Sequence, residues 1–182
     1  MVRALQRTHF VDIYFDADWY ADLLFALGQD VSSKGQVEET LAYYQEAVSI
    51  RKELENDKIS QNEANYANLL YFYVIALLSQ PLTQDSLNIS INSLISSNKL
   101  FEAVAESLDV KSLKNYASCC FNLGQIISLY TSSEKELGLS FVREAIDIGE
   151  RVVNNYGESS FSADVELFRR RYVELQQGMS ML

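Results

Sequence analysis

Apolar residues recur along most of the chain at the spacing of an α-helix. In the first segment Phe10, Tyr14, Ala17, Ala21 and Leu24 follow one another at intervals of three or four residues. The same periodicity continues to the end of the chain, with one proline and seven glycines in 182 residues. These patterns predict an all-α protein with seven helices, over about 9–33, 36–55, 61–80, 84–107, 109–130, 133–156 and 161–178.

Short polar motifs set the expected helix boundaries. Ser60 with Glu63, and Ser133 with Glu136, match the capping box that satisfies the free amides of a first helical turn. Asp109 is a candidate cap for the helix that follows it, and Asp16 or Asp18 is an alternative start for the first helix. Three residues that favour helix ends close the first, third and sixth helices: Gly35, Pro81 and Gly157.

The helices repeat in pairs. The dipeptide Tyr-Ala begins at residues 20, 66 and 116, so its spacings are 46 and 50 residues. Aligned on these dipeptides, the first helices of the three pairs agree in character position by position, and the second helices agree at Leu41, Leu87 and Leu139. Fixed periods of this length are typical of repeat proteins. The clearest columns are Leu24, Leu70 and Cys120; Phe25, Tyr71 and Phe121; and Leu27, Tyr73 and Leu123.

The first pair resembles a tetratricopeptide repeat. It combines a leading large residue, a Leu-Gly dipeptide, a turn glycine, an aromatic residue and a small alanine at the helix crossing. The third pair keeps most of this pattern, whereas in the second pair Val74 and Ser93 replace the glycine and the alanine. The tract AYYQEAVSIRKELEND also resembles the longer repeats of kinesin light chains and of bacterial sensor regions. The residues that carry the pattern are Leu24, Leu27, Gly28, Gly35, Tyr44 and Ala47, then Leu123, Gly124, Val142 and Ala145.

The resemblance implies an α-solenoid of three helical hairpins in a single domain. The repeats are expected at about 9–56, 61–108 and 110–156, followed by a capping helix at about 161–178. Glycine 28 and alanine 47 would allow the paired helices to approach closely. The last helix is rich in charge on one side, as the closing element of a solenoid requires.

In tetratricopeptide arrays the first helix of each hairpin lines a concave groove. Carried over by position, Phe25, Tyr71 and Phe121 would form an aromatic stripe flanked by polar groups. Rings with polar neighbours are typical of peptide-binding grooves. The alternative is that these rings simply pack against the neighbouring repeat. The expected lining is Asp22, Phe25, Gln29 and Ser32, then Asn68, Tyr71, Ile75 and Leu78, then Ser118, Phe121, Gln125 and Ser128.

The charge of the chain restricts its partners. A net charge of −10 and a pI near 4.6 disfavour nucleic acid and membrane surfaces and favour a basic or mixed-charge protein segment. No signal peptide is expected from the first ten residues. Cys119 and Cys120 are adjacent in an expected helix, which predicts free thiols and a cytoplasmic protein.

The sequence offers little for catalysis. His9 is the one histidine, and a lone histidine near the terminus makes a catalytic pair or a metal site a poor interpretation. Arg169, Arg170 and Arg171 are expected to pair with acids on their own helix. We therefore expect no enzyme, no metal and no cofactor.

Three functions are compatible with these features of the sequence. The first is an interaction scaffold that binds a peptide or protein segment in its groove. The second is a ligand-sensing regulatory module whose helices rearrange on binding. The third is a structural oligomerisation module.

Overall fold

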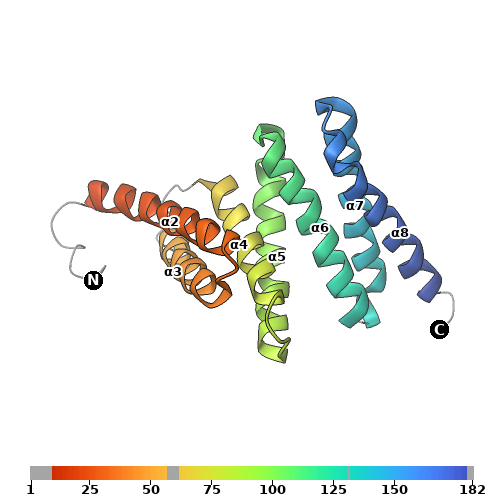
Figure 1. Ribbon diagram of the computed structural model, residues 1–182, viewed down its shortest axis with the longest axis horizontal. Coiled ribbons are helices and arrows are strands. Elements are labelled where there is room, and N and C mark those ends of the chain that lie inside the picture. The colour runs from red at the N-terminus through yellow and green to blue at the C-terminus, as the bar shows by residue number, and fades with distance from the viewer. Residues whose placement is uncertain (1–9, 57–61, 131, 180–182) are drawn as a thin grey trace. The chain divides into compact units, whose positions relative to one another are not determined.

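Every regular element in the described part of the chain is helical (Figure 1). The computed structural model describes residues 10–56, 62–130 and 132–179. The all-α class is therefore confirmed for these ranges, and none of their helices is long and apolar enough to span a membrane. The α-helices are α2 (Phe10–Ser33), α3 (Val37–Asn56), α4 (Glu63–Leu78), α5 (Gln84–Ala103), α6 (Val110–Tyr130), α7 (Lys135–Tyr156) and α8 (Ser162–Met179), with short 3₁₀ turns η1 (Ala105–Ser107), η2 (Ser132–Glu134) and η3 (Ser159–Phe161).

The chain divides into two compact units, Met1–Leu82 and Thr83–Leu182. The boundary falls inside the segment 61–108 that the sequence assigns to the second repeat. Helix α4 thus belongs to the first unit and α5 to the second.

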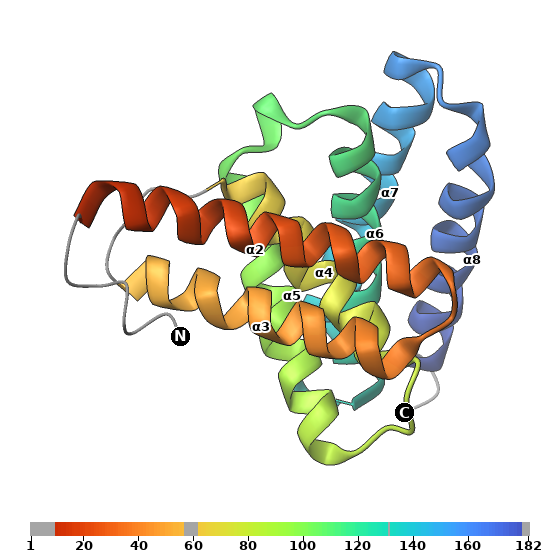
Figure 2. The same ribbon diagram turned by 60° about the vertical axis from the view of Figure 1, so that its left-hand side comes forward.

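In the first unit α2 and α3 form a hairpin, and α3 packs on α4 (Figure 2). Gly35 closes the hairpin with φ = 74°, a left-handed conformation that suits glycine. Gly28 lies against the ring of Tyr44, because a Cβ at residue 28 would stand 2.4 Å from Tyr44 Cε1. The expected close approach of the paired helices is therefore present, with buried Ala47 in the same interface region of α3.

In the second unit α5 packs on α6, α6 forms a hairpin with α7, and α8 packs on α7. As in the first hairpin, a glycine of the first helix allows close approach of the second helix at the α6–α7 contact. A Cβ at Gly124 would stand 2.5 Å from the carbonyl oxygen of Gly138, and Val142 and Ala145 are fully buried. Both hairpins thus depend on a glycine in their first helix.

The helix ends confirm one sequence motif and correct others. Asp109 caps α6, since its Oδ1 accepts a 2.7 Å hydrogen bond from Ser112 N. The capping box at Ser133 and Glu136 is wrong, because the 3₁₀ turn η2 occupies this region and α7 begins at Lys135 without a side-chain cap bond. The fourth helix is shorter than expected and ends at Ala103.

Two other caps differ from the sequence expectation. Ser60 lies outside the described residues, and α4 begins with Asn62 as its cap, whose side chain accepts from Asn65 N. A capping box that the sequence analysis did not identify starts α5, where Thr83 and Ser86 satisfy each other's backbone amides. Small hydroxyl side chains at both positions make this box, instead of the usual Ser–Glu pair.

Candidate functional site

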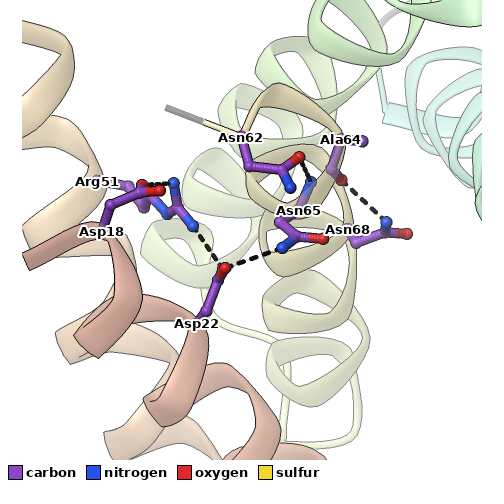
Figure 3. A network of polar contacts seen from close by, with 7 residues as sticks. All are labelled: Asp18, Asp22, Arg51, Asn62, Ala64, Asn65 and Asn68. Carbon is purple, nitrogen blue, oxygen red and sulfur yellow. Dashed lines mark hydrogen bonds and ion pairs between the residues drawn. The ribbon is translucent and has the colours of Figure 1, made fainter. Parts of the chain in front are cut away.

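A polar cluster joins the three helices of the first unit (Figure 3). Its centre is Arg51 of α3, whose side chain is 1% exposed and pairs with Asp18 and Asp22 of α2. The Arg51 Nη2 atom lies 2.5 Å from Asp22 Oδ1, and Nη1 donates to Asp18. A buried guanidinium needs such partners, because an unpaired charge away from water is strongly unfavourable.

The second oxygen of Asp22 contacts α4. Asn65 Nδ2 donates a 2.9 Å hydrogen bond to Asp22 Oδ2, so one carboxylate ties α2 to both α3 and α4. Asn68, one turn further along α4, is buried and donates to the carbonyl oxygen of Ala64 (Figure 3). Asp22 is thereby held in one position while about a third of its side chain stays accessible to solvent, at 35% exposure.

Burial and the neighbouring charges act on the pKa of Asp18 in opposite directions. Desolvation raises the pKa of Asp18 above its ordinary value, and the Arg51 guanidinium acts in the opposite direction. The nearby charge of Asp22 also contributes to raising the Asp18 pKa. Two carboxylates around one guanidinium leave the cluster with an excess negative charge, which would favour a cationic group on a partner.

Aromatic rings continue the cluster along α2 and α4. The Phe25 centroid lies 5.7 Å from that of Tyr44 and 5.8 Å from that of Phe72, and Phe72 in turn contacts Tyr71 at 5.4 Å. Phe25 is half-buried, whereas Tyr71 is 9% exposed. The α2–α4 contact therefore consists of a polar part at Asp22 and an aromatic part at Phe25.

Two more residues of the expected groove remain accessible in this unit. Gln29, one turn beyond Phe25, is half-buried, and Ile75, one turn beyond Tyr71, is 39% exposed. We call Asp22, Phe25, Gln29 and Ile75 the α2–α4 surface.

The expected groove residues of the second unit contact α8. The ring of Phe121 is 7% exposed and stacks on Phe168 with centroids 4.3 Å apart. Gln125 Oε1 accepts a 2.9 Å hydrogen bond from Arg171 Nε, and Ser118 is half-buried.

The aromatic stripe therefore takes part in packing within each unit. Phe25 contacts a ring of α4, and Phe121 contacts a ring of α8, as the packing alternative describes. Asp22 and Phe25 are brought together with α4 side chains in the first unit. The role of the groove residues in binding stays a prediction.

Sequence reasoning did not find Asp18, Arg51 and Asn65. A signal was present, because Arg51 stands four residues after Ala47 and three before Leu54, both buried, where the helical period places an apolar residue. Asp18 and Asp22 are likewise spaced i, i+4 on the expected first helix. A charge at a core position with acids on the partner helix is the pattern that would have indicated the cluster.

Two cysteines lie in the second unit. Cys119 and Cys120 are free and buried, and burial raises the pKa of Cys119 to about 12 and that of Cys120 well above its ordinary range. Thiols in this state are poor nucleophiles at neutral pH. Within the described ranges no group of three or more His, Cys, Asp or Glu side chains is placed to hold a metal ion, and His9 lies outside these ranges.

Comparisons with protein-family models, with curated proteins and with solved structures found no match to this chain. The function must therefore be argued from the residues and their geometry.

Proposed function

We propose that the chain is a protein-interaction module, a solenoid of tetratricopeptide-like hairpins, that binds a peptide segment of another protein on the α2–α4 surface. The observation that carries the proposal is the fixed, partly exposed Asp22 carboxylate beside the half-buried Phe25 ring. Such a pair offers a cationic or amide-bearing peptide one charged and one aromatic contact without reordering of side chains.

The remaining accessible groups of the α2–α4 surface fit the same ligand. Gln29 supplies an amide that both donates and accepts, and Ile75 supplies an exposed apolar contact. Residues 1–82 contain twelve Asp or Glu and six Lys or Arg, so the first unit attracts basic segments. The proposed ligand is an extended or helical peptide with an apolar residue next to Lys or Arg.

The proposal includes neither catalysis nor a cofactor. Binding, not turnover, is the role that a rigid carboxylate and a ring without an adjacent base can support. The two free, buried thiols agree with a reducing compartment, and we propose the cytoplasm.

Peptide selection followed by calorimetry tests the proposal. A displayed library of random peptides is selected on the wild-type chain, and the Kd of the best binder is then measured with Gln29→Ala and Ile75→Ser. Each variant should weaken binding about tenfold, because contacts at the centre of a small interface dominate affinity. Tyr71 is a poorer probe, since it is buried and its replacement would also disturb packing.

Leu167→Ser in α8 is the matched control, because the exposed fraction of Leu167, 44%, is similar to the 39% of Ile75. It should leave the Kd unchanged. A selected peptide that binds all three variants as tightly as the wild type would refute the proposal, as would a library that yields no binder.

A further inference from the structure

The outward face of α2 exposes a row of large apolar residues. Trp19 is 60% exposed, Leu23 is 37% exposed and Leu27 is 40% exposed. Their spacing of four residues places them on one ridge of the helix, and Tyr20 is 38% exposed beside them. The face of α2 that packs in the core, at Ala21, Leu24, Gly28 and Val31, is centred about a third of a turn away from this row. We call Trp19, Tyr20, Leu23 and Leu27 the α2 ridge.

The repeat shows that three of these four positions are covered in the other first helices. Leu27 aligns with Tyr73 and Leu123, which are 8% and 0% exposed. Leu23 aligns with Leu69 and Cys119, which are 1% and 0% exposed. Tyr20 follows the same rule, because its equivalents Tyr66 and Tyr116 are 3% and 4% exposed. The positions of Tyr20, Leu23 and Leu27 are therefore open on α2 and covered on α4 and α6, whereas Trp19 aligns with the half-buried Asn65 and Asn115.

The second unit shows what covers the column. On α6 it is the helix α5, which presents Leu94, Ser97, Asn98 and Phe101 at the spacing i, i+3, i+4 and i+7. The Phe101 ring stacks on Tyr116 with centroids 5.3 Å apart, and Cys119 Sγ donates to Ser97 Oγ at 3.5 Å. Asn98 Nδ2 donates to Cys120 Sγ at 3.0 Å, at the core position next to this column. The occupant that fits this column is thus an α-helix.

Charge selects among possible helices. Tyr20 OH donates to the exposed carboxylate of Glu46, which puts a negative charge beside the ridge, whereas Asp30 on the same side of α2 is already paired with Lys34. Together with the excess of acids in residues 1–82, the Glu46 carboxylate opposes docking of a second copy of the same surface and favours Lys and Arg. An exposed tryptophan at the end of such an apolar row is typical of an interface anchor.

From these observations we propose that the α2 ridge docks an amphipathic helix of a partner protein, with an apolar stripe at i, i+3, i+4 and i+7 and basic residues on its outer side. The α2 ridge and the α2–α4 surface lie on adjacent sides of α2, since Trp19 and Phe25 are about 120° apart around the helix axis. The partner helix takes on α2 the place that α5 takes on α6.

The single tryptophan of the chain makes the test specific, because intrinsic tryptophan fluorescence reports only on the α2 ridge. The probe is a synthetic peptide with the α5 sequence 84–103 in which the exposed positions are changed to lysine. We expect a saturable blue shift of the emission when this peptide is titrated. Two comparison peptides, one with glutamate at those exposed positions and one carrying Leu94→Ser with Phe101→Ser, should produce no saturable shift.

Variants of the chain complete the experiment. Leu23→Ser with Leu27→Ser keeps the reporter and should weaken binding of the lysine peptide at least about tenfold. Tyr156→Ser, at an exposed residue of α7 in the other unit, and Ile75→Ser on the α2–α4 surface should leave that binding unchanged. Circular dichroism confirms that each variant remains helical.

Four results would overturn the inference. The first is tryptophan emission that is already blue-shifted in the dilute free protein, and the second is a blue shift that grows with protein concentration while the measured mass doubles. The third is an equal response to all three peptides. The fourth is unchanged peptide binding by the Leu23→Ser, Leu27→Ser variant. The second would indicate self-association instead. A loss of binding in Ile75→Ser of the same size would show that the two surfaces are one.

Discussion

At the scale of single residues, one buried charge organises the first unit. Arg51 is as buried as the apolar core, and its two acidic partners are only partly exposed. A pair of this kind adds little net stability compared with apolar packing, but breaking it is costly. Its structural role is to fix Asp22 between α3 and α4.

Replacing both acids should therefore destabilise the protein strongly. Asp18→Asn with Asp22→Asn leaves the guanidinium buried without a counter-charge, and we expect the free energy of unfolding to fall by about 3 kcal/mol. Urea unfolding followed by circular dichroism measures the change. Asp30→Asn is the control, because Asp30 pairs with Lys34 at the surface and its loss should be barely detectable. An equally small effect of both changes would contradict the role given to Arg51.

The cap at Asp109 gives a prediction for pH. Hydrogen bonding from the Ser112 backbone lowers the pKa of Asp109 below its ordinary value of 3.8. A lowered pKa in the folded state means that the charged form stabilises the protein above pH 3.8 and that this stabilisation is lost as the pH falls through the folded-state pKa. At pH 7 the free energy of unfolding of the wild type should be about 1 kcal/mol higher than that of the Asp109→Ala variant. Thermal unfolding across pH should show this difference narrowing below pH 3.8, and a constant difference would refute it.

At the scale of helices, glycine sets the distance within each hairpin. The contact at Gly124 is with the backbone of α7, which cannot rotate away as a side chain can. Gly28 meets the ring of Tyr44, which is 1% exposed and equally confined. The hairpins therefore tolerate no Cβ at either position without a shift of the helices.

Alanine at these positions should destabilise the protein despite its better helix propensity. Gly124→Ala should lower the free energy of unfolding by about 1–3 kcal/mol, as overpacking of a core does. Gly178→Ala is the matched control, because a Cβ there meets nothing within 4 Å and should be neutral or slightly stabilising. A Gly124→Ala protein as stable as the Gly178→Ala protein would show that the hairpin has more room than the contacts indicate.

Local patterns in the sequence were sufficient for the helices but not for their side-chain partners. The 3.6-residue period, the turn glycine at 35 and the cap at Asp109 act within a few residues, so they can be read from the chain itself. The Arg51–Asp22 pair and the Phe121–Phe168 stack join different helices, and their pairing depends on how those helices cross. The capping box at Ser133 is a local motif that was nevertheless wrong, because a 3₁₀ turn takes the place of the cap there.

At the scale of the whole molecule, each of the two units contains a side chain whose environment can be measured by itself. Trp19 lies in the first unit, and the two cysteines lie in the second. The thiols are fully buried with raised pKa values, so both thiolate formation and reagent access require opening of the second unit.

A thiol reagent such as dithionitrobenzoate should consequently react with neither cysteine in the native protein. Two equivalents should react once urea unfolds the second unit, and the rate should follow the loss of helical signal. Rapid reaction of either thiol under native conditions would mean that the core around Cys119 and Cys120 opens readily. The single variants Cys119→Ser and Cys120→Ser would assign that reaction.

The measurement that tests binding by the first unit most directly is amide chemical-shift mapping by NMR with a selected peptide at saturation. We expect the largest shifts at residues 22–29 of α2 and 72–75 of α4, with small shifts in α6 to α8. Large shifts confined to residues 83–182, or no shifts at all, would contradict it.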